Sequence, residues 1–308
     1  MAREEPWRRR RPLLSGCLLL LVVGVVTWVA ASYLLGSLLG TTGFFTSRSH
    51  EQGVGVVEVK GVLTAADELI AQLNEFGRQD NIKAIILRID SPGGAVGASQ
   101  ELFTEVQRVN QRKPVVASMG SVAASGGLYA ALGAERIIAN PGTLTGSIGV
   151  IIKFPNLEEL FDKIGYRSET IKSGELKASG SPDRPLQPAE RRMLQEMVSG
   201  VHEQFIEAVA DSRGLSKETV RAFADGRIFT GTRARELRLV DQLGNLNDAA
   251  LLAAQLGGLN PDRVPELIYP PRREFSLLSL LLGSKGKTQL TSPLNLTPVL
   301  AYEWTITP

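Results

Sequence analysis

The longest apolar stretch of the chain lies near its N-terminus, because no charged side chain occurs between Arg11 and Arg48. Residues 13–39 are almost wholly apolar, and a helix needs about 20 apolar residues to cross a bilayer. The arginines Arg8–Arg11 precede this stretch, and the positive-inside rule keeps such a flank in the cytoplasm. The pattern predicts a basic cytoplasmic segment (1–12), a transmembrane helix (13–39) and a linker (40–52). We therefore expect a single-pass protein of the cell membrane with its larger part outside the cytoplasm.

Two other interpretations of the apolar stretch stay open. A cleaved signal peptide has a shorter apolar core and a small-residue cleavage site. Leu14-Ser15-Gly16-Cys17 is similar to a lipoprotein processing site, but such a cysteine follows the apolar core and Cys17 precedes it.

The next part of the chain alternates buried strand patterns with amphipathic helix patterns. Strands separated by helices favour a parallel sheet with right-handed crossovers. The helices show apolar residues at helical spacing, and the strands are short apolar runs. The segments expected are strands at 53–60, 84–89, 114–119 and 136–139, helices at 65–76 and 98–110, a turn at 120–125 and a small-residue helix after it.

Three further helices are expected in the second half. The longest covers residues 188–213, with Pro188 in its first turn and Gly214 as its stop signal. Shorter helices follow near 217–224 and 247–256. We expect a body at 53–258 and a tail at 259–308 that is rich in proline and lacks clear periodicity. The tail run Phe275–Leu282 is too short to span a bilayer, so it should pack against its own domain or another subunit.

The amino-acid composition excludes several classes of function. The 308 residues are 43% apolar and 21% charged, as in ordinary globular proteins. The single cysteine excludes an intramolecular disulfide, and two histidines make a His-rich metal centre unexpected. The net charge of +2 comes from the N-terminus, where residues 1–47 hold five Arg and two Glu. No basic domain or P-loop remains, so we expect no metal, nucleotide cofactor or nucleic-acid partner.

Three glycine- or lysine-marked loops are the candidates for chemistry. Ser91-Pro92-Gly93-Gly94 ends a strand, where open α/β sheets bind ligands, although a plain tight turn explains it too. Ala123–Gly127 places Ser125 between a strand and a helix, as a nucleophile or an ordinary helix cap. Ser121 competes with Ser125 for either role. Ile171–Ser179 follows a short β-like stretch and carries Lys172 and Lys177, which solvated loop lysines would also explain.

A nucleophilic serine needs a base. His50 lies close to the apolar stretch, and His202 borders the apolar stripe of the long helix, where packing is the ordinary explanation. Lysine is the alternative base. Its ordinary pKa of about 10.4 would have to fall by roughly 2–3 units for work near neutral pH. Burial can supply such a shift.

Five segments, in this order and spacing, resemble signal peptide peptidase A of the short bacterial and archaeal type. They are SPGG, MGSVAASGG, TLTGSIGV, IKSGELK and ADGRIFTGTRARELRLVDQLG, and the resemblance runs from about Gly53 to Leu256. It implies an α/β fold, a crotonase/Clp-like spiral of parallel sheet with flanking helices, preceded here by the transmembrane helix. It also implies a homo-oligomer in which serine and lysine meet across a subunit interface.

The resemblance assigns roles to five residues. It implies that Ser125 is the nucleophile and Lys177 the general base. It further implies that Gly94 and Gly126 donate backbone N–H groups to the oxyanion, and that Ser147 contacts the lysine. The sequence departs from the pattern at position 178, where relatives often carry an acidic residue and this chain has alanine.

The function implied is a membrane-anchored serine endopeptidase without cofactor. Its substrates would be cleaved signal peptides and other apolar peptides, and residues 13–39 would bind the bilayer. Two alternatives share the fold: a crotonase-like acyl-CoA enzyme, and a non-catalytic membrane scaffold that has no need of Lys177.

Overall fold

The computed structural model describes residues 12–38, 52–271 and 301–303, which fall into two units. In the N-terminal unit, residues Pro12–Leu38 form one helix, α1, at the position where a transmembrane helix was expected. Among the described residues, no helix combines the length and the apolar character needed to cross a membrane. The basic segment, almost all of the linker and the run Phe275–Leu282 lie outside the described residues.

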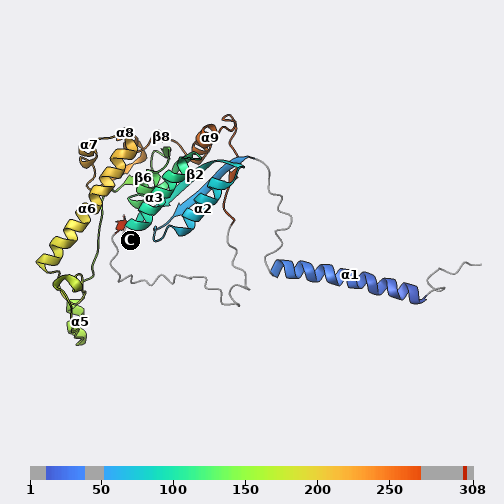
Figure 1. Ribbon diagram of the computed structural model, residues 1–308, viewed down its shortest axis with the longest axis horizontal. Helices are drawn as coiled ribbons and strands as arrows, with labels where there is room; N and C mark the ends of the chain where they lie inside the picture. Colours follow the sequence, from blue (N-terminus) through green and yellow to red (C-terminus); the bar gives the residue numbers. More distant parts are fainter. Residues whose placement is uncertain (1–11, 39–51, 272–300, 304–308) are drawn as a thin grey trace, which may run out of the picture. The chain divides into compact units, whose positions relative to one another are not determined.

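An eight-stranded sheet forms the centre of the second unit (Figure 1). Its order is β7-β6-β4-β2-β1-β9, and β5 joins β4 to β8. All pairs are parallel except β6 with β7, so the predicted α/β class and the mostly parallel sheet are confirmed. The strands are β1 (Gly53–Lys60), β2 (Ile82–Ser91), β4 (Val115–Ala124), β5 (Arg136–Ala139), β6 (Leu144–Gly146), β7 (Ile228–Thr230), β8 (Gln242–Leu243) and β9 (Leu267–Ile268).

Helices cover both faces of this sheet because its strands are apolar on both sides. In β1, Val57 and Val59 join the core cluster that includes α2 (Asp67–Arg78), α3 (Val96–Asn110) and α4 (Gly126–Ala131). Val54 and Val56 alternate with them and pack with the alanines of α9 (Leu246–Leu256) in the opposite cluster. This double burial fixes the register of the strands whose ends carry the candidate site.

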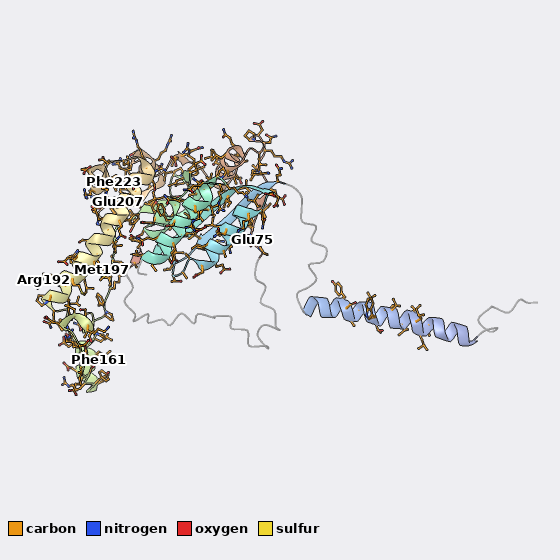
Figure 2. All side chains as sticks on the ribbon, in the orientation of Figure 1. Glu75, Phe161, Arg192, Met197, Glu207 and Phe223 are labelled. Atoms are coloured by element: carbon orange, nitrogen blue, oxygen red, sulfur yellow. The ribbon has the colours of Figure 1, made fainter. Side chains whose placement is uncertain are left out.

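The long helix α6 (Pro188–Arg213) connects the body to an outlying segment. It begins at Pro188 and stops at Gly214, whose φ of 61° is left-handed, as the sequence predicted. We call residues 155–187 the arm. It contains α5 (Glu158–Ile164) and the 3-10 helix Glu175–Ala178 but no buried residue. Figures 1 and 2 show α5 and its Phe161 beyond the N-terminal end of α6, away from the sheet.

Two sequence-based expectations were wrong. The turn expected at 120–125 is largely strand: β4 continues to Ala124, where residues 122–124 pair with β6 and Ala123 pairs with Ser91. Small side chains there allow close pairing inside the sheet, although glycine and serine usually signal a turn. The β-like stretch before Lys172 is not a strand; the arm is irregular at that point.

The remaining elements extend the edges of the fold. The helices α7 (Lys217–Arg221) and α8 (Gly231–Glu236) follow α6 and flank β7. A separate two-stranded antiparallel sheet pairs β3 (Gly93–Ala95) with β10 (Ala301–Glu303). This pairing was not expected, because the tail shows no clear periodicity in the sequence.

Candidate active site

Ser125 occupies the junction between β4 and α4. Its backbone has φ 52° and ψ −114°, a sparsely populated conformation for a residue with a side chain. Its N–H donates to the Gly146 carbonyl (2.8 Å), which joins it to the end of β6. The side chain is 1% exposed, yet its Oγ has no hydrogen-bond partner among the described residues. Ser125 therefore does not act as a conventional helix cap, because its hydroxyl makes no bond to α4.

Ser121, the competing serine, lies within β4 and is exposed. It lies five residues before the first residue of α4, Gly126, and it does not share the backbone conformation of Ser125. Position and geometry therefore distinguish the two serines.

The two glycine turns meet beside Ser125. A Cβ atom built on Gly126 would lie 3.2 Å from the Gly94 nitrogen and 2.4 Å from Ser99 Oγ. A Cβ on Gly94 would lie 2.1 Å from the Leu63 carbonyl oxygen, so neither glycine can carry a side chain. Backbone N–H groups at such a junction can stabilise the negative oxygen that forms when a nucleophile attacks a carbonyl. The structure thus brings Gly94 and Gly126 together.

The first of these turns is held by Ser91, for which the sequence had indicated no separate role. Ser91 is fully buried, and its Oγ accepts the Gly93 N–H (3.1 Å) and donates to the Gly61 carbonyl (2.6 Å). Ser91 therefore fixes the end of β2 and the position of the turn that follows it, which contains Gly93 and Gly94. The only signal in the sequence was its place at the start of the SPGG turn.

Ser147 lies one residue after β6 and also has φ 52°. Its N–H donates to the Arg227 carbonyl (2.8 Å), and its side chain is 6% exposed. Gly146, its neighbour, accepts the Ser125 N–H, so the two serines belong to adjacent strand ends. Ser147 lines a cavity of about 530 Å³ together with His202 of α6. His202 Nε2 is buried without a hydrogen-bond partner in the described part of the chain, and His50 lies outside it.

The two candidate lysines lie on the arm, apart from Ser125. Lys177 is exposed in the 3-10 helix, and its side chain makes no hydrogen bond or ion pair with described residues. Lys172 donates through Nζ to the Glu175 carbonyl (2.7 Å) and so supports the loop. Because Ser125 Oγ has no partner either, the structure of one chain does not join the predicted serine and lysine.

An ion pair ties the arm to α6. Arg184 donates to both carboxylate oxygens of Glu190, the shorter contact being 2.6 Å, and also to the Ala178 carbonyl (3.0 Å). Arg184, helped by the Gln187 N–H, lowers the pKa of the Glu190 carboxyl from 4.5 to about 2. The residue directly after Lys177 is therefore anchored, although its side chain is not the acidic one of the family pattern.

The described residues hold no group of three or more His, Cys, Asp or Glu side chains arranged for a metal. The chemistry present is that of one buried hydroxyl beside backbone N–H groups at the end of a parallel sheet.

Comparisons with known proteins agree with that chemistry. The model of peptidase family S49 matches residues 107–260, and the Clp protease model matches residues 57–143. The slr0021 protein of Synechocystis sp. is 41% identical over 257 residues, which cover 82% of this chain and 92% of that protein. The chloroplastic serine protease SPPA of Arabidopsis thaliana is 35% identical over 238 residues. Protease 4 of Haemophilus influenzae is 36% identical over 247 residues.

The lengths of these relatives differ. The region aligned with the Arabidopsis protein covers 75% of this chain but 35% of that protein. The region aligned with the Haemophilus protein covers 76% of this chain but 40% of that protein. The S49 family match, residues 107–260, includes β4, α4 and the arm. On this evidence the chain belongs to peptidase family S49, as a serine peptidase of the signal peptide peptidase A type.

Proposed function

We propose that the protein is an endopeptidase with a Ser–Lys dyad in which Ser125 is the nucleophile and Lys177 of a neighbouring copy is the base. The observation that carries this proposal is the buried, unpartnered Ser125 Oγ beside Gly94 and Gly126. A buried hydroxyl without a partner costs free energy, so its retention favours a catalytic role. Lys177, which is exposed and unpaired among the residues that the structure describes, is the complementary half.

The reaction follows from this arrangement. Neutral Lys177 takes the proton of Ser125 Oγ, and the oxygen attacks the substrate carbonyl. The N–H groups of Gly94 and Gly126 stabilise the oxyanion, an effect worth about 3–4 kcal/mol per donor. The lysine returns its proton to the leaving amine, and water then releases the acyl group from Ser125. Ser147, next to Ser125 in the sheet, would hold the lysine in place.

The arm supplies a reason to expect assembly. Five of its apolar side chains are at least 40% exposed: Leu160, Ile164, Tyr166, Ile171 and Leu176. Apolar side chains gathered on a segment without a core favour burial against a partner. A second copy that covered the arm would also remove water from Lys177, and burial favours the neutral form of a lysine. Homo-oligomerisation would therefore position and activate the base in one step.

Membrane anchoring through residues 13–39 belongs to the same proposal. Its support is the uncharged stretch between Arg11 and Arg48 and the basic flank before it. With the N-terminus in the cytoplasm, the catalytic domain would lie outside the cell membrane. The substrates would then be cleaved signal peptides and other apolar peptides released at the membrane.

A fluorophosphonate probe on the full chain tests the function, with a signal peptide as substrate in a parallel assay. The proposal expects covalent labelling at Ser125 and cleavage of the peptide. Labelling should disappear in Ser125→Ala and persist in Ser121→Ala. An unlabelled, folded protein that does not cleave peptides would instead favour the crotonase-like enzyme or the scaffold.

A further inference from the structure

The turn that carries Gly94 lies outside the eight-stranded sheet and is held by residues 61–63, which we call the strap. The Leu63 N–H donates to the Gly93 carbonyl (2.8 Å), and the Ala95 N–H donates to the Leu63 carbonyl (2.8 Å). Leu63 pairs with Gly94 in parallel register, and its side chain is 4% exposed in the core. The strap therefore occupies one edge of the turn.

The bonds to the strap decide the direction of the Gly94 N–H group. The peptide between Gly93 and Gly94 is trans, so its carbonyl and its N–H point in opposite directions. Because the carbonyl is bound by Leu63, the Gly94 N–H points away from the strap. The first turn of α4 lies next to its nitrogen, since a Cβ atom built on Gly126 would be 3.2 Å from it. The orientation of this peptide plane therefore determines where the proposed oxyanion donor points.

The hydroxyl of Ser91 fixes the strap and the preceding peptide plane together. Ser91 is 0% exposed, and its Oγ accepts the Gly93 N–H (3.1 Å) while it donates to the Gly61 carbonyl (2.6 Å). Gly61 is held a second time, because its N–H donates to the Asp90 carbonyl (3.0 Å). One buried hydroxyl thus connects the end of β2 with both the strap and the turn.

The turn needs such an anchor because glycine supplies its bends. Gly93 has φ 106° and Gly61 has φ 67°, conformations that glycine adopts without steric cost and leaves as readily. The Gly93 peptide can therefore rotate once the Ser91 hydroxyl no longer accepts its N–H. Ser91 also borders α4, because a Cβ atom built on Gly127 would lie 2.9 Å from the Ser91 carbonyl oxygen.

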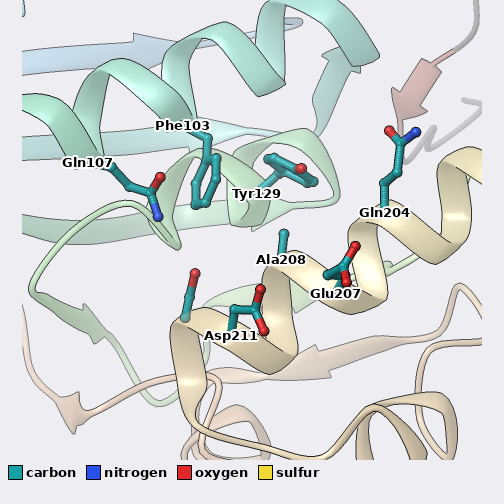
Figure 3. A pocket seen from close by; sticks show the side chains of 8 residues that line it. Phe103, Gln107, Tyr129, Gln204, Glu207, Ala208 and Asp211 are labelled. Carbon is teal, nitrogen blue, oxygen red and sulfur yellow. The ribbon is translucent and has the colours of Figure 1, made fainter.

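The other proposed donor, Gly126, has a different support. It is the first residue of α4, and all residues of this short helix are buried. Figure 3 shows Tyr129 of α4 beside Phe103 of α3, and their rings pack edge to face with centroids 5.2 Å apart. The Tyr129 ring also packs on Phe205 of α6 at 4.9 Å. Packing of the helix thus places Gly126, whereas the position of Gly94 depends on polar contacts.

We propose that Ser91 is a positioning residue for catalysis, whose hydroxyl fixes the strap and the Gly93 peptide and thereby aims the Gly94 N–H at the oxyanion. The inference rests on the proposed peptidase function and adds the residue that orients one of its two donors. Ser91 is fully buried, so it acts through the turn and not by contact with the substrate. The oxyanion forms only after the nucleophile attacks. Loss of the hydroxyl should therefore destabilise the transition state and leave substrate binding nearly unchanged.

The test compares two buried hydroxyls that make the same pattern of bonds. Between β5 and β6, Thr143 is 1% exposed, and its Oγ1 donates to the Gly120 carbonyl (2.7 Å) and accepts the Asn140 N–H (3.1 Å). In the full chain in detergent, Ser91→Ala and Thr143→Val each leave two backbone groups without a partner. Both variants should therefore melt several degrees below the wild type.

Their kinetics with a signal-peptide substrate should differ. Ser91→Ala should lower kcat about 10- to 100-fold and change KM by less than about threefold, because one oxyanion donor is misaligned. Thr143→Val should keep kcat within about threefold of the wild type, since its hydroxyl supports no donor. Equal losses of kcat in the two variants, or a loss in Ser91→Ala that appears only in KM, would overturn the positioning role.

A peptide aldehyde gives a readout of the oxyanion donors alone. Its adduct with the nucleophilic serine carries an oxygen that needs the same N–H groups as the transition state. The inhibition constant should therefore rise in Ser91→Ala by about the factor by which kcat falls. An unchanged constant would contradict the proposal. If Ser91→Ala does not fold, Ser91→Cys, which keeps a weaker donor and acceptor, should show the same changes to a smaller extent.

The wild-type protein separates this inference from the proposed function. A folded wild type that neither cleaves the peptide nor reacts with the fluorophosphonate probe would refute the peptidase, and the positioning role with it. An active wild type together with full kcat and full aldehyde affinity in Ser91→Ala would refute the positioning role alone.

Discussion

The body around Ser125 and the arm that carries Lys177 are opposite kinds of structure. Ser125 is 1% exposed, at the end of a strand buried on both faces, and its backbone is fixed by the Gly146 carbonyl. The arm, residues 155–187, has no buried residue, and Ile171 within it is 96% exposed. Packing in the body is sufficient to hold a strained backbone, whereas the arm holds its shape through a few polar contacts and the Arg184–Glu190 pair.

This contrast separates the two halves of the proposed catalytic dyad. Folding of one chain places the proposed nucleophile Ser125 beside the turns of Gly94 and Gly126, but it leaves Lys177 in solvent. The base would be completed only by association. On this proposal, the position of Ser125 is fixed by packing within one chain, whereas the position of Lys177 is fixed only when a second copy covers the arm.

The largest expected effect concerns the body. Ser125→Ala should lower kcat/KM for a signal-peptide substrate by at least about 10⁴-fold, because it removes the nucleophile. The fold should be unchanged, since the hydroxyl makes no bond that folding requires. Ser121→Ala is the matched control and should keep most of the activity. An essential Ser121 with a dispensable Ser125 would reverse our assignment.

A similar loss is expected from the arm, without any loss of stability. Lys177→Met keeps the length of the side chain but cannot accept a proton, so turnover should fall by about 10³-fold or more. Lys172→Met removes only the bond to the Glu175 carbonyl and should cost less than about tenfold. Calorimetry should show unchanged melting for both variants. Near-normal turnover by Lys177→Met would exclude it as the base, and a simultaneous loss in His202→Gln would point to His202.

A smaller effect is expected from the Arg184–Glu190 ion pair, which connects the arm to α6. Glu190→Gln weakens the pair with Arg184 and should lower activity several-fold by loosening the arm. Its effect on stability should depend on pH. The carboxyl has a pKa of about 2 in the folded protein, below its ordinary 4.5, so its contribution is full above pH 4.5 and is lost as pH falls through 2. The melting-temperature difference between wild type and Glu190→Gln should therefore shrink from pH 6 to pH 3; a constant difference would argue against the ion pair.

The smallest effect is a gain in stability. Ser125 and Ser147 both have φ 52°, a region that costs a residue with a side chain about 1–3 kcal/mol. Ser125→Gly relieves this cost, partly offset by the freedom of glycine in the unfolded chain. We expect an inactive protein that melts about 2–4 °C above Ser125→Ala. A lower melting temperature for the glycine variant would show that the body does not store strain at this position.

The sequence predicted regular elements best where burial alone decides them. The bounds of β1, β5 and α6 agree with the apolar patterns to the residue. The end of β4 was misjudged, because small residues that signal a turn in isolation can also pair closely inside a sheet. Local composition does not distinguish a turn from a closely paired strand end. Here the pairing of β4 with the neighbouring strands β2 and β6 decides for the strand.

The site was predictable in part. The sequence indicated that Ser125, Gly94 and Gly126 would lie close together, because each follows the end of a strand in the same sheet. The structure shows Gly94 next to Gly126. The tail strand was not predictable, because three residues carry no periodicity and Tyr302 lies about two hundred residues from Gly94. Within one chain, Lys177 is exposed and its side chain makes no hydrogen bond or ion pair with described residues, so its proposed partner on a second copy was not predictable from this geometry.

Mixing two inactive variants tests the central claim most directly. Full chains with Ser125→Ala and with Lys177→Met should each be inactive, and their co-expressed mixture should cleave a signal-peptide substrate. If serine and lysine come from adjacent copies in a closed assembly, about one site in four combines both intact residues. We predict roughly a quarter of wild-type activity in the purified mixture. Stable mixed assemblies without activity would contradict a dyad that is completed between chains.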